Sequence, residues 1–256
     1  LTNKKKIGFI PTMGCLHDGH VSLIRKSKKK KLLTIVSIFV NPLQFNNKKD
    51  YKKYPKTIST DLRICKKNKV DYVYLPQEND MYPEKKIVIK NKIHFFKNYM
   101  EGKFRPGHFE GVIEVVKRLL SHIKTTYLFL GKKDYQQCMV LKKMIEITQL
   151  KVNINLAETI REDNGLAMSS RNQRLSNNEK QKSLSIYKAL NHIKKYLKPG
   201  SLTPIIEESK TMLIESDFLI DYIEITDSNL NEVSNWDGKT PLIALVAATI
   251  NNIRLI

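Results

Sequence analysis

The chain has 256 residues and 41% hydrophobic content, which is enough to build one large or two modest domains around a buried core. No run of about 18 apolar residues occurs, so the sequence predicts no membrane-spanning helix. A net charge of +20 attracts nucleic acid, anionic membranes or small anions, and charge alone does not choose among them. The lysines are spread through every segment and lack the interleaved aromatic residues that single-strand binding uses. We therefore interpret the charge as drift on solvated faces and expect no nucleic acid and no membrane as partners.

The N-terminus and the cysteines bear on the cellular compartment. The segment Leu1 to Lys6 is polar and basic, and the apolar run Ile7 to Ile10 is too short for the core of a signal peptide. Cys15, Cys65 and Cys138 are widely spaced and odd in number, which fits neither a disulfide framework nor a CxxC metal site. We expect reduced thiols and a cytoplasmic protein.

The first two-thirds of the chain alternates short β-branched runs with helical patterns, which is typical of a parallel sheet with crossover helices. Strands are expected at Ile7 to Ile10, Leu33 to Val40, Val70 to Leu75, Tyr127 to Leu130 and Val152 to Ala157. Helices are expected at Val21 to Lys31, Ile58 to Lys67, Val112 to His122 and Gln136 to Gln149. The fold class is therefore α/β, with a Rossmann-like, doubly wound parallel sheet whose ligands bind beyond the carboxyl ends of the strands.

The pattern changes after Arg171. Ser176 and Glu179 form a capping box that opens a helix running to Tyr196, and Pro199-Gly200 ends it. A second helix, Pro204 to Glu215, and two strands, Asp221 to Thr226 and Leu242 to Ile250, are expected to follow. The sequence thus predicts a nucleotide- and substrate-binding domain over residues 1–172 and a small α+β lid domain over residues 173–256.

The first chemical motif is Pro11-Thr12-Met13-Gly14-Cys15-Leu16-His17-Asp18-Gly19-His20, which lies between the first strand and the first helix. Gly14 and Gly19 permit a tight turn, and a helix start offers N–H groups and a positive dipole end to phosphates. His17 and His20 can then point the same way and stabilise charge on a departing pyrophosphate. Alternatively, two histidines three apart are a surface pair or part of a metal site, although metalloprotease helices use four-residue spacing.

Three later segments place polar side chains just after expected strands or in loops. In Phe39-Val40-Asn41-Pro42-Leu43-Gln44-Phe45, Pro42 ends the strand and leaves the amides of Asn41 and Gln44 either to bind a small hydroxy acid or to cap backbone groups. In Gly131-Lys132-Lys133-Asp134-Tyr135-Gln136-Gln137, Lys133 supplies a charge for phosphate, and Asp134 can bind ribose or orient Lys133. In Met168-Ser169-Ser170-Arg171, two hydroxyls and a guanidinium match a triphosphate, although an ordinary Ser-Arg turn has the same sequence.

These segments, with Glu101-Gly102-Lys103-Phe104-Arg105-Pro106-Gly107-His108-Phe109 and the residues Gly165 to Ala167 before the Met168 loop, occur in an order that resembles the pantothenate synthetase (pantoate–β-alanine ligase) family. This family belongs to the HIGH-type nucleotidyltransferases, and the resemblance covers nearly the whole chain. One motif alone would indicate only the superfamily, whereas five ordered segments are far more specific.

The resemblance implies a role for each candidate residue. Catalytic roles are implied for His20, His17, Lys133 and Arg171. ATP binding is implied for Met13, Gly14, His17, His20, Gly131, Lys133, Asp134, Ile160, Met168, Ser169, Ser170 and Arg171, with Ile160 offering main-chain contacts to adenine. Pantoate binding is implied for Gln44 and Gln137 with Asn41 close by, and Arg105 and His108 border the site. The family usually has Glu where this chain has Lys132, which leaves the role of that side chain open.

The resemblance also implies the reaction. The family uses ATP to activate pantoate as pantoyl adenylate and joins it to β-alanine, giving pantothenate, AMP and pyrophosphate. We expect Mg²⁺ to be held by phosphates and water, with no dedicated metal site in the protein, and we expect a homodimer. The alternatives are another HIGH-type nucleotidyltransferase and a basic RNA-binding protein, for which the charge is the only support.

Overall fold

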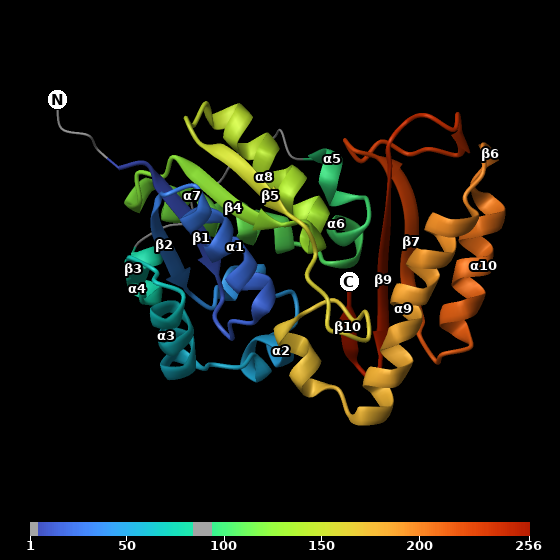
Figure 1. The fold of residues 1–256 in the computed structure, drawn as a ribbon, viewed down its shortest axis with the longest axis horizontal. Helices are drawn as coiled ribbons and strands as arrows, with labels where there is room; N and C mark the ends of the chain where they lie inside the picture. Colours follow the sequence, from blue (N-terminus) through green and yellow to red (C-terminus); the bar gives the residue numbers. More distant parts are fainter. Residues whose placement is uncertain (1–4, 84–93) are drawn as a thin grey trace. The chain divides into compact units, whose positions relative to one another are not determined.

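The computed structural model describes residues 5–83 and 94–256, so the start of the basic N-terminal segment lies outside the described part (Figure 1). Contacts divide the chain into two compact units, Leu1–Ile160 and Arg161–Ile256. This division falls earlier than the boundary predicted near residue 172, because Leu166 belongs to the core of the second unit and Arg161 pairs with Ala167. The predicted domains 1–172 and 173–256, as functional domains, stay a prediction.

The first unit is built on a five-stranded parallel sheet in the order β3-β2-β1-β4-β5. The strands are β1 (Ile7–Thr12), β2 (Leu33–Ile38), β3 (Tyr72–Tyr74), β4 (Tyr127–Gly131) and β5 (Asn153–Ala157). All four neighbouring pairs are parallel. The chain leaves β1 towards β2 on one side and leaves β4 towards β5 on the other, so the strand order reverses between β1 and β4. The predicted doubly wound α/β fold is confirmed.

Helices connect these strands and cover the sheet (Figure 1). The longer ones are α1 (Asp18–Lys29), α3 (Ile58–Lys67), α7 (His108–His122) and α8 (Tyr135–Thr148). Short turns of helix are η1 (Pro42–Gln44), α2 (Lys48–Lys53), α4 (Glu78–Met81), α5 (His94–Lys97), α6 (Glu101–Phe104) and η2 (Lys132–Asp134). These short pieces could not be predicted from the sequence, because three to six residues are too few to show a helical repeat.

The faces of the sheet follow the alternation of side chains along its strands. Ile10 and Phe129 are fully buried on one face, in a cluster with Ile24 of α1 and Cys65 of α3. Helices α7 and α8 contact each other, and their buried residues form the other helical layer. Near-continuous apolar strands such as β1 are what a sheet covered on both faces requires.

Two helices begin earlier than predicted, and both changes affect candidate residues. Helix α1 begins at Asp18 with His17 as its N-cap, so His20 lies in the first turn and Gly19 is helical. Helix α7 begins at His108 after Gly107, which has φ +81°. The apolar repeat starts only after these polar first turns, which is why the pattern placed both starts too late.

The second unit pairs two helices with a small antiparallel sheet. Helix α9 (Asn177–Tyr196) has the predicted capping box between Ser176 and Glu179. The remaining elements are η3 (Ser170–Arg174), α10 (Thr203–Ile214), β6 (Gly200–Ser201), β7 (Leu219–Asp227), β8 (Asn235–Trp236), β9 (Leu242–Ile250) and β10 (Ile253–Leu255). The sheet order is β10-β9-β7, and both neighbouring pairs are antiparallel, which agrees with the predicted α+β tail.

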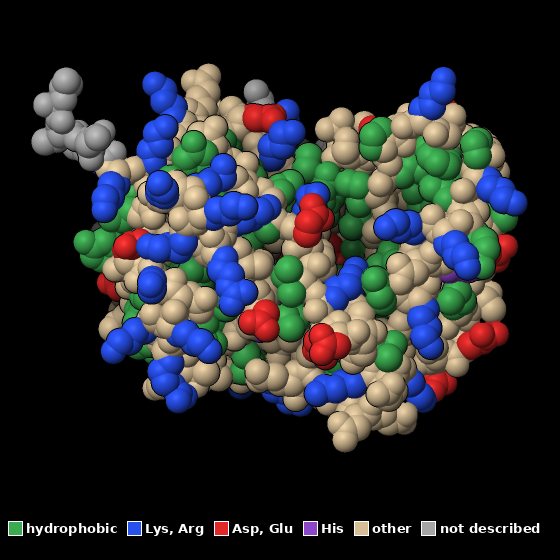
Figure 2. All heavy atoms as spheres, viewed as in Figure 1, with side chains coloured by type: hydrophobic (Ala, Val, Ile, Leu, Met, Phe, Trp, Pro, Cys, Tyr) green, Lys and Arg blue, Asp and Glu red, His purple; other side chains and the backbone are tan. Residues whose placement is uncertain are grey.

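The surface reflects the composition. On the face drawn in Figure 2, Lys and Arg side chains are spread singly over the surface and do not gather into one patch. Some are paired, as in the ion pair of 2.8 Å between Lys28 and Asp71. No helix among residues 5–83 and 94–256 is long and apolar enough to cross a membrane.

Helix α7 packs closely on η1 through Gly111. A Cβ at Gly111 would lie 2.3 Å from the carbonyl oxygen of Leu43 and 2.6 Å from the backbone nitrogen of Gln44, where the neighbours are backbone atoms that cannot rotate away. Only glycine therefore allows the helix to support the turn that carries Gln44.

This contact gives a first testable prediction. Gly111→Ala should displace η1 and destabilise the fold by about 1–3 kcal/mol, the usual cost of overpacking, despite the better helix propensity of alanine. Urea denaturation of the two proteins measures the difference. The control is Gly131→Ala, because a Cβ there would meet no atom within 4 Å. Equal stabilities of Gly111→Ala and the unchanged chain would contradict this account of the packing.

Candidate active site

Two candidate segments of the first unit meet at the carboxyl ends of β1 and β4. These strands are neighbours in parallel register, with Gly8 opposite Tyr127 and Phe9 opposite Leu128. The turn from Met13 to His20 follows one strand, and the segment beginning at Gly131 follows the other. This is the point at which the strand order reverses and where open α/β sheets bind their ligands.

The backbone N–H groups of the turn after β1 donate to side chains of the protein. Gly14, at φ +80°, donates its N–H to the hydroxyl of Thr12 at 3.1 Å. The next two N–H groups, of Cys15 and Leu16, donate to the carboxylate of Asp61 at 3.0 and 2.8 Å. The protein itself therefore uses these three N–H groups of the turn.

The two histidines close the start of helix α1. The ring nitrogen Nδ1 of His17 accepts the N–H of Gly19 at 3.2 Å, and Nδ1 of His20 accepts the N–H of His17 at 3.3 Å. An acceptor nitrogen carries no proton, so in the neutral ring the proton is on Nε2. Each imidazole thus takes up a backbone donor and presents an Nε2–H donor in its place. The ring centroids are 4.1 Å apart, so the two rings lie beside each other.

Electrostatics keeps these rings neutral. Burial, followed by the charge of Lys133, lowers the pKa of His17 from 6.5 to about 4. Burial lowers the pKa of His20 to about 3, with smaller contributions from His17 and Lys133. Lys133 is therefore within electrostatic reach of both imidazoles, as its place after β4 requires. The positive charge of this group of side chains comes from the lysine, and the imidazoles contribute uncharged donors.

The segment after β4 separates its two lysines. The ammonium of Lys133 is 3.9 Å from the carboxylate of Asp134, and the Lys133 side chain is 20% exposed. Lys132 instead forms a 2.6 Å ion pair with Glu158, and both of these side chains are exposed. The lysine that departs from the family pattern thus faces a surface carboxylate. Gly131 has extended backbone and empty space where a Cβ would be, so its lack of a side chain leaves the sheet edge open.

The orientation of Gln44 follows from backbone groups. Asn41 is buried, with Oδ1 accepting the N–H of Leu43 at 3.2 Å and Nδ2 donating to the carbonyl of Gly111 at 3.1 Å. These contacts fix the Asn41 amide, whose Nδ2 also donates to Oε1 of Gln44 at 2.9 Å. The NH₂ group of Gln44 then lies on the side away from Asn41, 3.2 Å from the sulfur of Met13. Gln44 therefore offers donors, and a ligand here has to supply acceptors.

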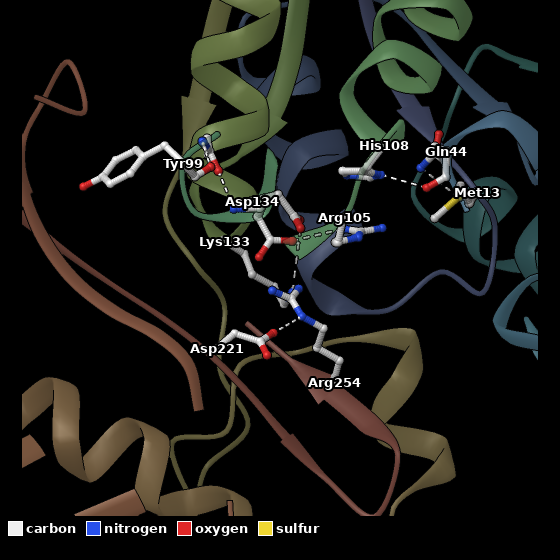
Figure 3. Close-up of polar contacts among 11 residues, drawn as sticks. Met13, Gln44, Tyr99, Arg105, His108, Lys133, Asp134, Asp221 and Arg254 are labelled. Carbon is white, nitrogen blue, oxygen red and sulfur yellow. Dashed lines mark hydrogen bonds and ion pairs between the residues drawn. The ribbon is translucent and has the colours of Figure 1, made fainter. Parts of the chain in front are cut away.

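His108 has the opposite tautomer from the other two histidines. Its Nδ1 is 2.8 Å from the main-chain carbonyl of Gln44, which can only accept, so the proton is on Nδ1 and Nε2 is an acceptor. Burial and the nearby Arg105 lower its pKa to about 4. Arg105 itself pairs with Glu101 at 3.2 Å. Figure 3 shows Gln44 between Met13 and His108.

Two neighbouring glutamines at the start of α8, Gln136 and Gln137, differ in their hydrogen bonds. Gln136 is buried; it accepts the N–H of Glu101 at 2.8 Å and donates to the carbonyl of Tyr99 at 2.9 Å. Gln137 is half-buried, and its side chain makes no hydrogen bond within the described part of the chain. One amide is used to hold the segment before α6, and the adjacent amide remains available to a ligand.

The remaining candidates lie elsewhere in the chain. Ile160 is half-buried and follows β5 at the end of the first unit. Met168, Ser169, Ser170 and Arg171 belong to the second unit, where the Ser169 hydroxyl accepts the N–H of Arg171 at 3.2 Å and caps η3. Asn172 braces this loop by donating to Glu162 and to the carbonyl of Ala167. The ATP-binding roles of these residues stay a prediction.

The structure also reveals residues that the sequence analysis did not single out: Asp61, Tyr82, Gly111 and Gln136. The Tyr82 hydroxyl donates to Oδ1 of Asn41 at 2.7 Å, and the guanidinium of Arg118 lies over its ring. These residues act through partners far away in sequence. No local pattern could have marked them, although the helical spacing of Thr57 and Asp61 places both near one end of α3.

The strand order and the polar groups at the reversal point place the chain among the doubly wound α/β proteins that bind ligands at this edge. A sequence model of the pantoate–β-alanine ligase family matches residues 1–256. The pantothenate synthetase of Sulfurihydrogenibium sp. (strain YO3AOP1) is 41% identical, covering 98% of this chain and 91% of that protein. That of Thermosipho africanus (strain TCF52B) is 39% identical, covering 100% and 92%.

Solved structures agree with the sequence matches. The pantoate–β-alanine ligase of Thermus thermophilus superposes with a TM-score of 0.90 at 32% identity, covering 98% of this chain and 92% of that one. The enzyme of Francisella tularensis, complexed with β,γ-ATP and β-alanine, gives 0.81 at 35% identity, covering 100% and 89%. The chain belongs to the pantoate–β-alanine ligase family, and it is a ligase that joins pantoate to β-alanine.

The buried neutral histidines predict how stability depends on pH. Between pH 6.5 and about 4 the unfolded chain binds protons that folded His17, His20 and His108 do not. The contribution of these histidines to the free energy of unfolding is therefore complete above pH 6.5 and is lost as the pH falls. His20→Asn should reduce the slope of unfolding free energy against pH in this window. Urea denaturation at several pH values measures the slope, and an unchanged slope would show that His20 is not neutral in the folded protein.

Proposed function

We propose that the chain drives this condensation with ATP through an enzyme-bound pantoyl adenylate. The observation that carries the proposal is the pair of neutral Nε2–H donors on His17 and His20, next to the charge of Lys133 at the reversal point of the sheet. Binding a triphosphate requires hydrogen-bond donors and positive charge, and the carboxyl ends of β1 and β4 supply both. Membership of the ligase family sets aside the two alternatives, another HIGH-type nucleotidyltransferase and a basic RNA-binding protein.

In the first step a carboxylate oxygen of pantoate attacks the α-phosphorus of ATP. The new oxygen–phosphorus bond forms as the bond to the β-phosphate oxygen breaks, and pyrophosphate leaves. The Nε2–H groups of His17 and His20 and the ammonium of Lys133 donate to oxygens on which charge develops. Because these imidazoles are already neutral and held by their Nδ1 atoms, they need no reorientation and lose no proton during the step.

In the second step the free amine of β-alanine attacks the carbonyl carbon of the adenylate. The carbon–nitrogen bond forms, the bond to the AMP oxygen breaks, and the nitrogen loses a proton. No covalent bond to the protein is required, so positioning and charge stabilisation supply the catalysis.

The side chains of Gln44, Gln137 and His108 suit the binding of pantoate. Gln44 presents its NH₂ group and can donate to a carboxylate or hydroxyl oxygen, whereas the unprotonated Nε2 of His108 can accept from a hydroxyl. Gln137 offers an amide that makes no hydrogen bond to the residues that the structure describes. Asn41 acts mainly by orienting Gln44, since its own donor and acceptor are bonded within the protein. Arg105 borders this group and contributes positive charge.

On the first unit, the proposed ATP-binding residues are Gly131, Met13, Gly14, Asp134 and Ile160. By family resemblance the loop from Met168 to Arg171 of the second unit would also bind ATP, with Arg171 on a phosphate. The described residues contain no group of three or more His, Cys, Asp or Glu side chains able to hold a metal ion. An Mg²⁺ ion would then be bound by the phosphates and would neutralise part of their charge, and Asp134, 3.9 Å from Lys133, is a carboxylate of this segment. The lid role of the second domain, the homodimer and the cytoplasmic location remain part of the proposal.

The order of the two steps is tested by isotope exchange. Labelled pyrophosphate should exchange into ATP when pantoate is present and β-alanine is absent, because the adenylate forms before the amine is needed. His20→Ala should lower this exchange by about a hundredfold, the scale for one preorganised donor. Exchange that requires β-alanine, or that proceeds without pantoate, would refute the adenylate route.

Alanine variants of three glutamines test the proposed recognition of pantoate. Gln44→Ala and Gln137→Ala should raise the Michaelis constant for pantoate far more than that for ATP. Gln136→Ala is the matched control: it removes an amide that holds backbone groups of the segment before α6, so it should chiefly lower stability. Steady-state titration of each substrate measures the effects, and equal losses for both substrates in Gln137→Ala would count against the assignment.

A further inference from the structure

Asp61 is a buried carboxylate on helix α3 that faces the turn between β1 and α1. It is 1% exposed, and both of its oxygens are engaged. Oδ1 accepts the N–H of Leu16 at 2.8 Å, whereas Oδ2 accepts the N–H of Cys15 at 3.0 Å and the hydroxyl of Thr57 at 3.2 Å. The contacts join residues 45 and 46 positions apart, so helix α3 holds a turn that is remote in sequence.

This carboxylate occupies the place where a phosphate-binding turn would hold its anion. Successive N–H groups that converge after a strand form a concave anion site, and a negative charge there is bound strongly. Here the protein supplies the anion itself. A Cβ at Gly14 would lie 3.0 Å from Oδ2 of Asp61, so the backbone closes tightly over the carboxylate.

The next residue in the turn is the cap of helix α1. Leu16 is fixed by Asp61, and His17 follows it directly, with His20 bonded back to the His17 N–H. Any shift of Leu16 therefore moves the first imidazole and the hydrogen bond that sets the tautomer of the second. The carboxylate acts on the ring donors through this short path.

We propose that Asp61 is a positioning residue, which fills the anion site of the turn and so sets the direction and tautomer of the His17 and His20 rings. The proposal rests on the proposed function for its catalytic consequence. It means that ATP phosphates are bound by side-chain donors after β1, because Asp61 already takes the backbone N–H groups of Cys15 and Leu16, and Thr12 takes that of Gly14.

Asp61→Asn is the primary test. The volume is kept, but one oxygen becomes an NH₂ group that faces a backbone N–H, so one of the two contacts turns repulsive. The kcat for pantoate-dependent exchange should fall about tenfold or more, the usual effect of misplacing a catalytic group, with a smaller change in the Michaelis constant for pantoate.

The matched control is Asp71→Asn. Asp71 also accepts a backbone N–H, that of Thr34 at 2.7 Å, but at the start of β2 and thus at the opposite edge of the sheet. It should leave kcat unchanged. Equal losses of kcat in the two variants would show a general effect of stability and overturn the proposal.

A second readout separates this proposal from the proposed function. Imidazole ¹⁵N chemical shifts report which ring nitrogen carries the proton, and they need no activity. In the unchanged protein His17 and His20 should both be protonated on Nε2, and Asp61→Asn should shift both signals whereas Asp71→Asn should not. Shifted signals without any exchange reaction would leave the positioning role intact and refute only the catalytic one.

Unchanged imidazole signals in a folded Asp61→Asn protein would overturn the positioning role, even if activity were lost. If Asp61→Asn does not fold, Thr57→Val decides, because it removes one donor to Oδ2 and keeps the carboxylate. Relative to the unchanged protein it should shift the same two signals and lower kcat, and no shift would overturn the proposal.

Discussion

The parallel pairing of β1 with β4 is the constraint on which the candidate active site depends. These strands are distant in sequence, yet their parallel register brings both to an end at the same edge of the sheet. The segment after β1 contains the two histidines, and the segment after β4 contains Lys133. Because the strand order reverses between them, the two exits diverge and leave the edge accessible. Apolar side chains on both faces of the sheet, such as Ile10 and Phe129, hold this register. The chemistry therefore depends on a hydrophobic core whose side chains take no direct part in the reaction.

The amino-acid sequence was sufficient for the architecture and for the loops of the first unit. Period-two and helical repeats are local signals, so all five strands and four longer helices of that unit were predicted, with errors of a few residues at their ends. Motifs placed after strands predicted which segments meet, since carboxyl ends of parallel strands share an edge. Short helical turns such as η1 and α6 escaped prediction because they are fixed by packing and leave no repeat.

The detailed polarity of the site could not be predicted in the same way. That Gln44 presents donors follows from Leu43 and Gly111 acting through Asn41, and that the turn after β1 is filled by a carboxylate follows from Asp61 on a different helix. These are contacts between residues that the chain brings together only after folding. Sequence patterns indicate which side chains can donate or accept, whereas the partners that decide the direction are tertiary.

The capping of α1 by its own imidazoles makes the electrostatic background of the first unit's edge nearly constant. With the pKa of His17 near 4 and that of His20 near 3, neither ring changes charge across the range of acidity found in living cells. The field at the sheet edge is then governed by the nearby charges of Lys133 and Arg105. Histidine, commonly a sensor of acidity, serves here as a fixed dipole that does not respond to it.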